Sequence, residues 1–207
     1  MKYISERKNK SALHVWLLIS FVCAVIWSAV KPINWGTWGA EVGPAIIGVA
    51  ILVLTYRKFR FSSPVYEFIW LSGIIMSMGG HYSYEHFPPF DTIKEAFHLS
   101  RNHFDRLGHI VQGIVVVFLV REVLARFRIV TKQKWLIAIA ILISLANSAV
   151  YEILEFAATA MMDKDPDRML GAQGDIWDSQ WDMLNALCGA CGGMLVFGKY
   201  HARKMRE

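Results

Sequence analysis

The chain has 207 residues, of which 55% are hydrophobic and 19% are charged, and its formal net charge is +5. This length suffices for one compact helical domain and leaves no room for an additional soluble one. The basic residues lie at the ends of apolar segments, where they can contact anionic lipid headgroups, so we expect membrane lipids as partners and no nucleic acid.

Six apolar segments approach the roughly 20 residues that a helix needs to cross a bilayer. They predict an all-α fold: a polytopic membrane protein whose six-helix transmembrane bundle forms a single integral membrane domain over residues 1–207. In chain order, the predicted spans are residues 13–30, 38–56, 65–80, 107–123, 135–156 and 181–197.

The first span follows a basic stretch, residues 1–10, which is the order found in a secretory signal peptide. The apolar run is long, and Trp27, Trp35 and Trp38 flank it without a small-residue cleavage site. We therefore expect an uncleaved first span.

The loops between the spans alternate in charge. If both termini are cytoplasmic, sixteen of the 22 basic residues lie on the cytoplasmic side and every aspartate lies on the outer side. The positive-inside rule therefore predicts a cytoplasmic N-terminus and a cytoplasmic C-terminus. The sixteen are Lys2, Arg7, Lys8, Lys10, Arg57, Lys58, Arg60, Arg121, Arg126, Arg128, Lys132, Lys134, Lys199, Arg203, Lys204 and Arg206.

A long outer loop, residues 81–106, follows the third span. Within it, Pro88 and Pro89 precede a stretch with helical spacing of apolar residues, 91–99. We expect an interfacial helix there, with Asp91 as its N-cap.

Polar residues share helix faces at the outer ends of the fourth and fifth spans. Asp105 and His109 are four residues apart, and Glu152 and Glu155 are three apart. Residues at these spacings lie on one face of a helix. Because a charge in lipid costs roughly 3 kcal/mol or more, these side chains are expected to face the bundle interior.

Aspartates at i, i+3 and i+7 form a carboxylate stripe at the start of the sixth helix. They are Asp175, Asp178 and Asp182. Gly171 and Gly174 come just before this stripe and favour a tight turn into the helix.

Imidazole and carboxylate groups at one depth suit a zinc, manganese or iron ion, whereas oxygen ligands alone favour magnesium or calcium. We therefore predict a divalent metal in an outward-opening pocket between spans three to six. The favoured ligands are His109, Asp105, Glu155 and Asp178, and the further candidates are His103, Asp175 and His81.

The remaining polar residues have expected roles around this metal. Asp182 or Glu152 would be the general base for an attacking water. Arg101 and Arg106 would either bind a phosphate headgroup or form internal salt bridges. Two interpretations without catalysis stay open: a structural network in which the carboxylates pair with Arg101, Arg106 and Arg168, and a proton or ion pathway. The absence of carboxylates near the membrane midplane argues against the pathway.

All three cysteines, Cys23, Cys188 and Cys191, lie within predicted spans, so no disulfide framework is expected. The last two have the spacing of a thioredoxin motif but lack its βαβ context. Gly189 and Gly193, four residues apart in the same segment, instead favour close packing of two helices.

These motifs resemble those of the uncharacterised bacterial inner-membrane family typified by YjdF, over nearly the whole chain. The resemblance implies a multi-pass protein of the bacterial inner membrane and implies no activity. The matching elements are Gly80-His81-Tyr82, Ser100-Arg101-Asn102-His103, Asp105-Arg106, Gly108-His109, Tyr151-Glu152, Glu155, Gly174-Asp175, Trp177-Asp178 and Gln180-Trp181-Asp182.

A looser resemblance is to VanZ-like membrane proteins. Three elements occupy places comparable to the polar elements of that family: residues 105–109, Glu152 or Glu155, and residues 182–185 before Gly189. The resemblance implies a four-helix core of spans three to six that acts near envelope lipids or peptidoglycan precursors.

These observations favour an inner-membrane protein that is a metal-dependent hydrolase of a lipid or lipid-linked envelope substrate. The alternative is a non-enzymatic membrane protein: a small-solute or ion transporter, or a structural or partner-binding protein with a polar network.

The charge pattern predicts the topology directly. A reporter fused after Glu207 should show a cytoplasmic location, and a reporter inserted within residues 163–173 should show a periplasmic one. Paired phosphatase and fluorescent-protein fusions measure both positions, and a periplasmic C-terminus would contradict the assigned orientation.

Overall fold

A computed structural model gives the structure of the chain, and its described residues are 2–161 and 173–206. In these two ranges the chain forms seven α-helices and one 3-10 helix, and no strand. The predicted all-α fold is therefore confirmed. The elements are α1 (Lys2–Ser28), α2 (Trp35–Thr55), α3 (Ser63–Tyr82), η1 (Tyr84–His86), α4 (Pro88–Ala96), α5 (Phe104–Arg126), α6 (Gln133–Met161) and α8 (Asp178–Lys204).

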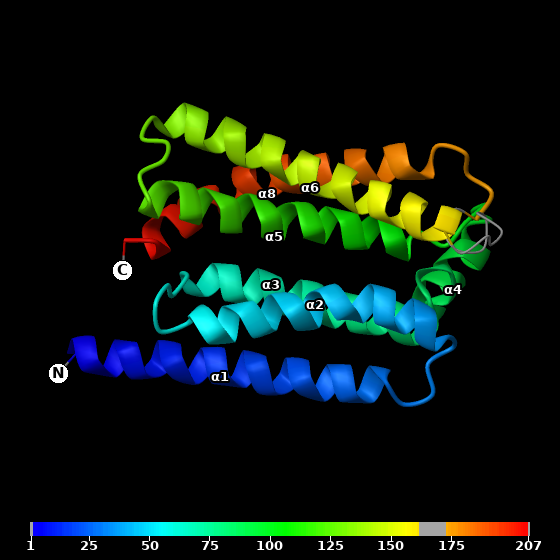
Figure 1. Cartoon of the computed structure of the whole chain (residues 1–207), viewed down its shortest axis with the longest axis horizontal. Helices are drawn as coiled ribbons and strands as arrows, with labels where there is room; N and C mark the ends of the chain where they lie inside the picture. The colour runs from blue at the N-terminus through cyan, green and yellow to red at the C-terminus, as the bar shows by residue number, and fades with distance from the viewer. Residues whose placement is uncertain (1, 162–172, 207) are drawn as a thin grey trace. The chain divides into compact units, whose positions relative to one another are not determined.

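The chain divides into two compact units. The first contains residues 1–83 and 201–207, and the second contains residues 84–200. Helices α1, α2 and α3 make up the first unit, whereas η1, α4, α5, α6 and most of α8 make up the second (Figure 1).

In the first unit, α3 packs against both α1 and α2. Gly73 allows the close approach to α1, because a Cβ at this position would lie 2.6 Å from the ring of Phe21. The indole nitrogen of Trp38 donates a hydrogen bond of 3.0 Å to the hydroxyl of Ser28 and so joins α2 to α1.

In the second unit, α5 packs against α6 and lies very close to α8. A Cβ at Gly113 would overlap the backbone carbonyl of Ala186, and a Cβ at Gly189 would overlap the carbonyl of Ile110. Gly193, the second glycine of the predicted packing pair, also faces α5. These small residues set the distance between two helices that both carry polar residues at one end.

The predicted count of six spans is not exact. Among the described residues, four helical segments are long and apolar enough to cross a membrane: Ser11–Ser28, Trp35–Thr55, Phe104–Arg126 and Gln133–Ala158. Helices α3 and α8 have 20 and 27 residues, so length is not what separates them from the other four. They contain fewer valine, leucine and isoleucine residues than the other four helices, which lowers their hydropathy.

The short helix after the third long helix also differs from its predicted bounds. It begins at Pro88, with Phe87 as its N-cap, and Asp91 lies in its first turn instead of capping it. The physical reason is that proline fits the first helical position, where its missing N–H is not needed. The two prolines therefore start the helix three residues earlier than expected.

The contact of α5 with α8 predicts a difference between two glycines of the same helix. Gly189→Ala should lower the unfolding temperature, because the new methyl group overlaps the Ile110 carbonyl, and overpacking costs about 1–3 kcal/mol. Gly192→Ala is the matched control, since a Cβ there meets nothing within 4 Å. Thermal unfolding in detergent measures both, and equal unfolding temperatures would contradict the close contact.

Candidate functional site

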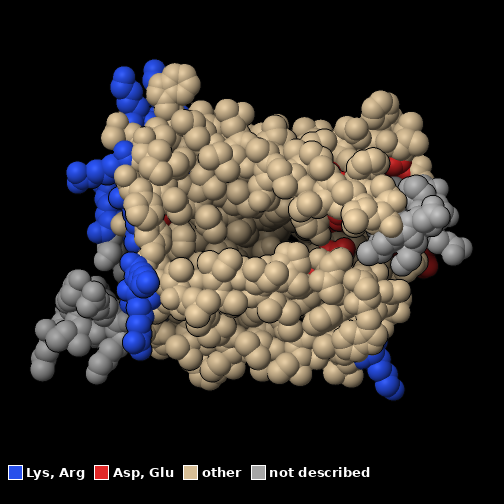
Figure 2. Space-filling view, viewed as in Figure 1, with Lys and Arg blue, Asp and Glu red and all other residues tan. Residues whose placement is uncertain are grey.

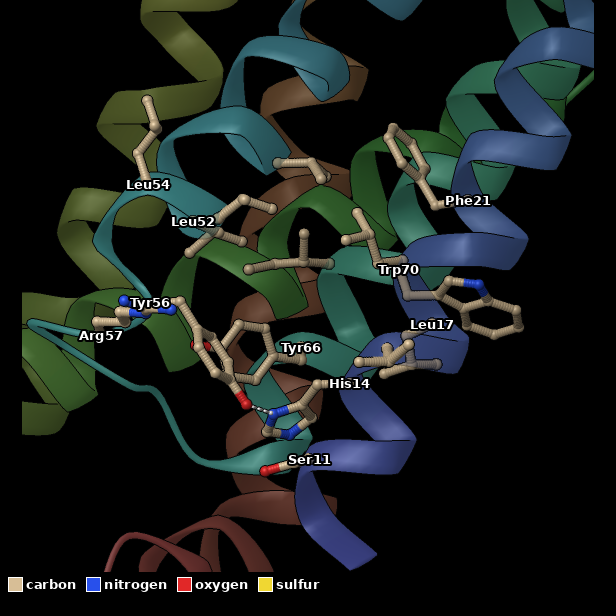
Figure 3. Close-up of a pocket in the computed structure, with 15 residues that line it drawn as sticks. Ser11, His14, Leu17, Phe21, Leu52, Leu54, Tyr56, Arg57, Tyr66 and Trp70 are labelled. Atoms are coloured by element: carbon tan, nitrogen blue, oxygen red, sulfur yellow. Dashed lines mark hydrogen bonds between the residues drawn. The ribbon is translucent and has the colours of Figure 1, made fainter. Parts of the chain in front are cut away.

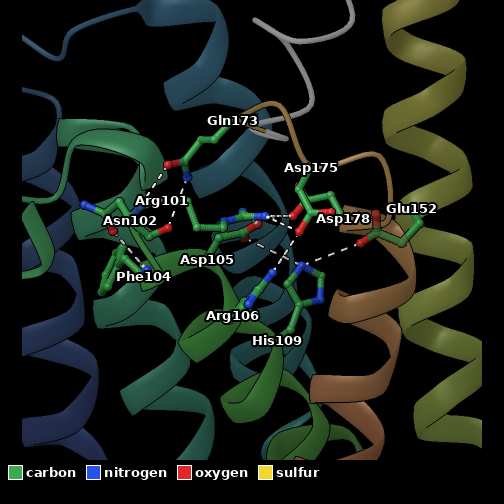
Figure 4. Close-up of polar contacts among 10 residues, drawn as sticks. All are labelled: Arg101, Asn102, Phe104, Asp105, Arg106, His109, Glu152, Gln173, Asp175 and Asp178. Carbon is green, nitrogen blue, oxygen red and sulfur yellow. Dashed lines mark hydrogen bonds and ion pairs between the residues drawn. The ribbon is translucent and has the colours of Figure 1, made fainter. Parts of the chain in front are cut away.

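Acidic side chains gather at one end of the second unit. Helix α6 ends there, and α5 and α8 begin there, so Asp105, Glu152 and Asp178 reach the same region (Figure 4). Figure 2 shows acidic side chains of this unit near that end and basic side chains at the opposite end. We call the following set the polar cluster: Arg101, Asp105, Arg106, His109, Glu152, Asp175, Asp178 and Asp182.

Three side chains of the polar cluster are close enough to share one metal ion. Asp105, His109 and Asp182 each offer one ligand atom, and these atoms all lie within 4.8 Å of one another. His109 is only 6% exposed and Asp182 only 2%. The Oδ1 atom of Asp182 has no hydrogen-bond partner among the described residues. Burial of such an acceptor is costly unless a proton or a cation satisfies it.

The imidazole of His109 is oriented by contacts on both of its sides. Its Nε2 atom lies 3.7 Å from Asp105 Oδ1 and 3.6 Å from Glu152 Oε1. Its Nδ1 atom lies 3.5 Å from the hydroxyl of Ser148, and its ring meets the ring of Tyr151 edge-on. Nε2 is therefore the nitrogen that faces the carboxylates, and a proton on Nδ1 leaves Nε2 able to bind a metal.

Arg101 is the buried cation of the polar cluster, with a side chain that is 4% exposed. It forms an ion pair with Asp178 and lies 3.7 Å from Asp175 and 4.0 Å from Asp105. Burial acts to lower the pKa of Arg101, but the hydrogen bond and the charge of Asp178 outweigh it and raise the pKa overall. Arg101 thus remains a cation and ties the segment before α5 to the first turn of α8.

Arg106 is the more accessible of the two arginines. Its guanidinium donates to Asp175 at 3.0 Å and lies 5.4 Å from the ring centroid of Trp181, while 23% of its side chain stays exposed. Both arginines therefore form internal salt bridges, which was one of the two expectations from the sequence. Only Arg106 also retains a substantial exposed surface.

Asn102 holds the loops around the polar cluster in place, a role that the sequence did not indicate. It is fully buried. Its backbone exchanges two hydrogen bonds with the side chain of Gln173, at 2.9 and 3.1 Å. Its side chain donates to Asp91 and to the carbonyl of Phe87. It also accepts from the backbone of Phe104 (Figure 4). One residue thus joins α4, the start of α5 and the segment before α8.

Two further side chains near the polar cluster gave no recognisable signal in the sequence. Glu85, in η1, is close enough to interact electrostatically with Arg101, and burial raises the pKa of its carboxyl. Ser179 hydrogen-bonds the carboxylate of Glu152. Glu85 sits in a loop without helical spacing, so only the folded chain shows its position.

Five predicted ligands lie outside the group that could share a metal. Asp178 and Asp175 pair with Arg101 and Arg106 instead. Glu155 is half-buried on α6, one turn beyond the glutamate that faces His109. His103 is the N-cap of α5, where burial and the charge of Arg106 lower its pKa. His81 belongs to the first unit, where its ring packs on Trp27 at 4.6 Å. Gly171 and Arg168 lie outside the described residues.

Comparison with known proteins supports the family resemblance. Residues 13–203 match a family described as "Predicted membrane protein (DUF2238)". The chain is 36% identical over 199 residues to the inner membrane protein YjdF of Escherichia coli (strain K12), an alignment that covers 96% of this chain and 92% of the relative. No solved structure matches. The looser resemblance to VanZ-like proteins gains no support from these matches.

The burial of Arg101 predicts an asymmetry between the two arginines. Arg101→Gln leaves Asp178 buried without its cation, and the loss of one partner of a buried ion pair costs about 3–5 kcal/mol. Arg106→Gln, the matched control, removes a partly exposed pair and should cost less than about 1 kcal/mol. Thermal unfolding in detergent measures both losses.

A double variant, Arg101→Gln with Asp178→Asn, should lose less stability than the two single variants added together, because the buried charge disappears with its partner. Equal losses for Arg101→Gln and Arg106→Gln would show that the buried pair does not hold α8 to α5.

Proposed function

The chain belongs to the DUF2238 family of membrane proteins, and from the geometry of its polar cluster we propose that it is a metal-dependent hydrolase of a lipid or lipid-linked envelope substrate. Its relative in E. coli is an inner membrane protein, and four helical segments here are apolar enough to cross a membrane. A multi-pass inner-membrane location follows from these two findings.

The convergence of Asp105, His109 and Asp182 carries the proposal. One imidazole and two carboxylates form a donor set that suits zinc, manganese or iron. Three protein ligands with a further open position are the arrangement of catalytic metal sites. The buried Oδ1 of Asp182, which lacks a hydrogen-bond partner among the described residues, supports a bound cation at this point.

The charge of the polar cluster also favours a cation. Its five carboxylates face only two guanidinium groups, so ionisation of all of them would leave a surplus of negative charge in a largely buried site. Buried charges without partners are strongly destabilising. A divalent ion would neutralise most of the surplus and would let the carboxylates stay ionised.

The ligand set we propose differs from the one that the spacing favoured. Asp178 pairs with Arg101, and Glu155 lies outside the group, so Asp182 takes a ligand position instead of acting as the base. Glu152 then remains as the general base, because its carboxylate lies beside His109 and is oriented by Ser179.

A bound metal would act as a Lewis acid and lower the pKa of water to about 7. Glu152 would accept the proton of the attacking water and return it to the leaving oxygen of the substrate. Arg106 would contact a phosphate of the substrate, since its guanidinium is the more exposed one.

A structural polar network is the second candidate function, and one observation favours it. Arg101 and Arg106 already pair with Asp178 and Asp175. In this case the polar cluster would tie the start of α8 to α5 without a metal, and Asp182 would carry a proton instead. A protein that docks a partner on this end could use the same network.

Metal content distinguishes the two candidates. The full chain, purified in detergent and incubated with zinc, manganese or iron(II) before desalting, should retain about one ion per chain in inductively coupled plasma mass spectrometry. Asp182→Asn and His109→Gln should each retain at least roughly tenfold less, because each removes one of three ligands.

Three controls accompany this measurement. Glu155→Gln, on the neighbouring turn of α6, and the pair of Cys188→Ala and Cys191→Ala, which replaces two free thiols, should keep the metal. Glu152→Gln should also keep it, because the proposed base is not a ligand. A wild-type protein that stays folded and binds none of these ions would leave the structural network in place of the hydrolase.

A further inference from the structure

The first unit contains a cavity of about 480 Å³ among α1, α2 and α3 (Figure 3). This volume falls in the range of roughly 300–1,000 Å³ that is usual for small-molecule sites. Most of its wall is aliphatic or aromatic, and none of its lining residues is acidic. The lining includes Leu17, Leu18, Phe21, Val49, Leu52 and Trp70. The cavity shares no residue with the polar cluster.

The polar groups of the cavity wall are concentrated at one end. There, His14 lies 2.8 Å from the hydroxyl of Tyr56 and 3.1 Å from the hydroxyl of Ser63. Its ring packs on that of Tyr66, with centroids 4.3 Å apart (Figure 3). Ser11 lies at the same end and accepts a hydrogen bond from Arg60. The opposite end, toward Phe21, is apolar.

The cationic groups also lie at the polar end. Arg57 lines the cavity and is exposed. Arg60 lies beside it in the turn between α2 and α3, with its guanidinium 5.1 Å from the ring centroid of Tyr56. This end of the cavity is therefore positively charged and is suited to an anionic group.

From its polar end to its apolar end, the cavity matches one leaflet of a bilayer, in which polar headgroups are followed by hydrocarbon. The apolar part of α1 begins at Ser11 and that of α2 ends at Thr55, so the polar end lies at the edge of the hydrocarbon region. From Ser11 to Phe21, α1 rises by roughly 15 Å, at 1.5 Å per residue. This depth is about half of the hydrocarbon core, which is about 30 Å thick.

We propose that this cavity binds an anionic phospholipid, with one acyl chain between α1, α2 and α3 and the phosphate at Arg57. The acyl chain fills apolar space that would otherwise lack contact atoms. The phosphate accepts charge-assisted hydrogen bonds from the guanidinium at the membrane boundary. The site is independent of the proposed metal centre, and neither requires the other.

Photocrosslinking in vesicles tests this site. The full chain is reconstituted into phosphatidylcholine vesicles that contain a small fraction of phosphatidylglycerol with a photoreactive group at the end of one acyl chain. Crosslinked peptides are mapped by mass spectrometry. We expect adducts around Phe21, Leu52 and Trp70, and we expect unlabelled phosphatidylglycerol to compete much better than additional phosphatidylcholine.

Two neighbouring cations provide a matched pair of variants. Arg57→Gln should reduce the preference for phosphatidylglycerol roughly tenfold, since it removes a charge-assisted hydrogen bond. Lys58→Gln removes the same charge from the next residue, which is exposed and does not line the cavity, and should change the preference less than about twofold.

A third variant, Leu52→Trp, fills the cavity and should abolish the adducts. Arg57→Gln should keep the adducts but show a weaker preference for phosphatidylglycerol. If Leu52→Trp does not fold, the pair of cation variants decides alone. Equal competition by the two lipids, or equal effects of Arg57→Gln and Lys58→Gln, would overturn the proposal and leave the cavity as space filled by bulk bilayer hydrocarbon.

Discussion

The geometry of the polar cluster depends on the buried ion pair between Arg101 and Asp178. Taking two such ions out of water costs several kcal/mol for each of them, and only close, well-oriented pairing repays that cost. The first turn of α8 therefore stays next to the segment that leads into α5. Asn102, the neighbour of Arg101, extends this attachment by hydrogen bonds to α4 and to Gln173.

A second constraint acts further along the same two helices. Gly113 and Gly189 bring α5 and α8 so close that backbone carbonyls would meet any added Cβ. The ion pair at the start of α8 and the glycine contact further along the helix act together. They fix the separation of α5 and α8 and the rotation of both helices about their axes. Asp182 lies on α8 between these two constraints, one turn after Asp178, and this position directs its carboxylate toward His109.

Sequence periodicity predicted the elements of this arrangement better than their pairing. Helical spacing placed Asp105 with His109 and identified a stripe of aspartates on the sixth helix, because residues at these spacings share a face whatever surrounds them. Which aspartate meets Arg101 and which meets His109 depends on the rotation of α8, and that rotation is set by packing against α5. Asn102 and Glu85 act through loop contacts that have no periodic pattern. The composition of α3 and α8 likewise explains the inexact number of spans, since both helices are long but less apolar than the other four.

The salt bridges of the polar cluster are not the observation that points to a ligand, because a structural network would contain them as well. The groups that indicate a ligand are the acceptor atoms that the arginine salt bridges do not use. A proton can bridge two acceptors, for example a carboxylate and an imidazole, but Asp105, His109 and Asp182 direct three acceptors to one small volume. A single cation satisfies all three at once. The buried Oδ1 of Asp182 would cost about 1–3 kcal/mol if left without any partner. A neutral apolar residue would avoid that cost, and this acid, unpartnered in the described part of the chain, is the observation on which the proposed metal site rests.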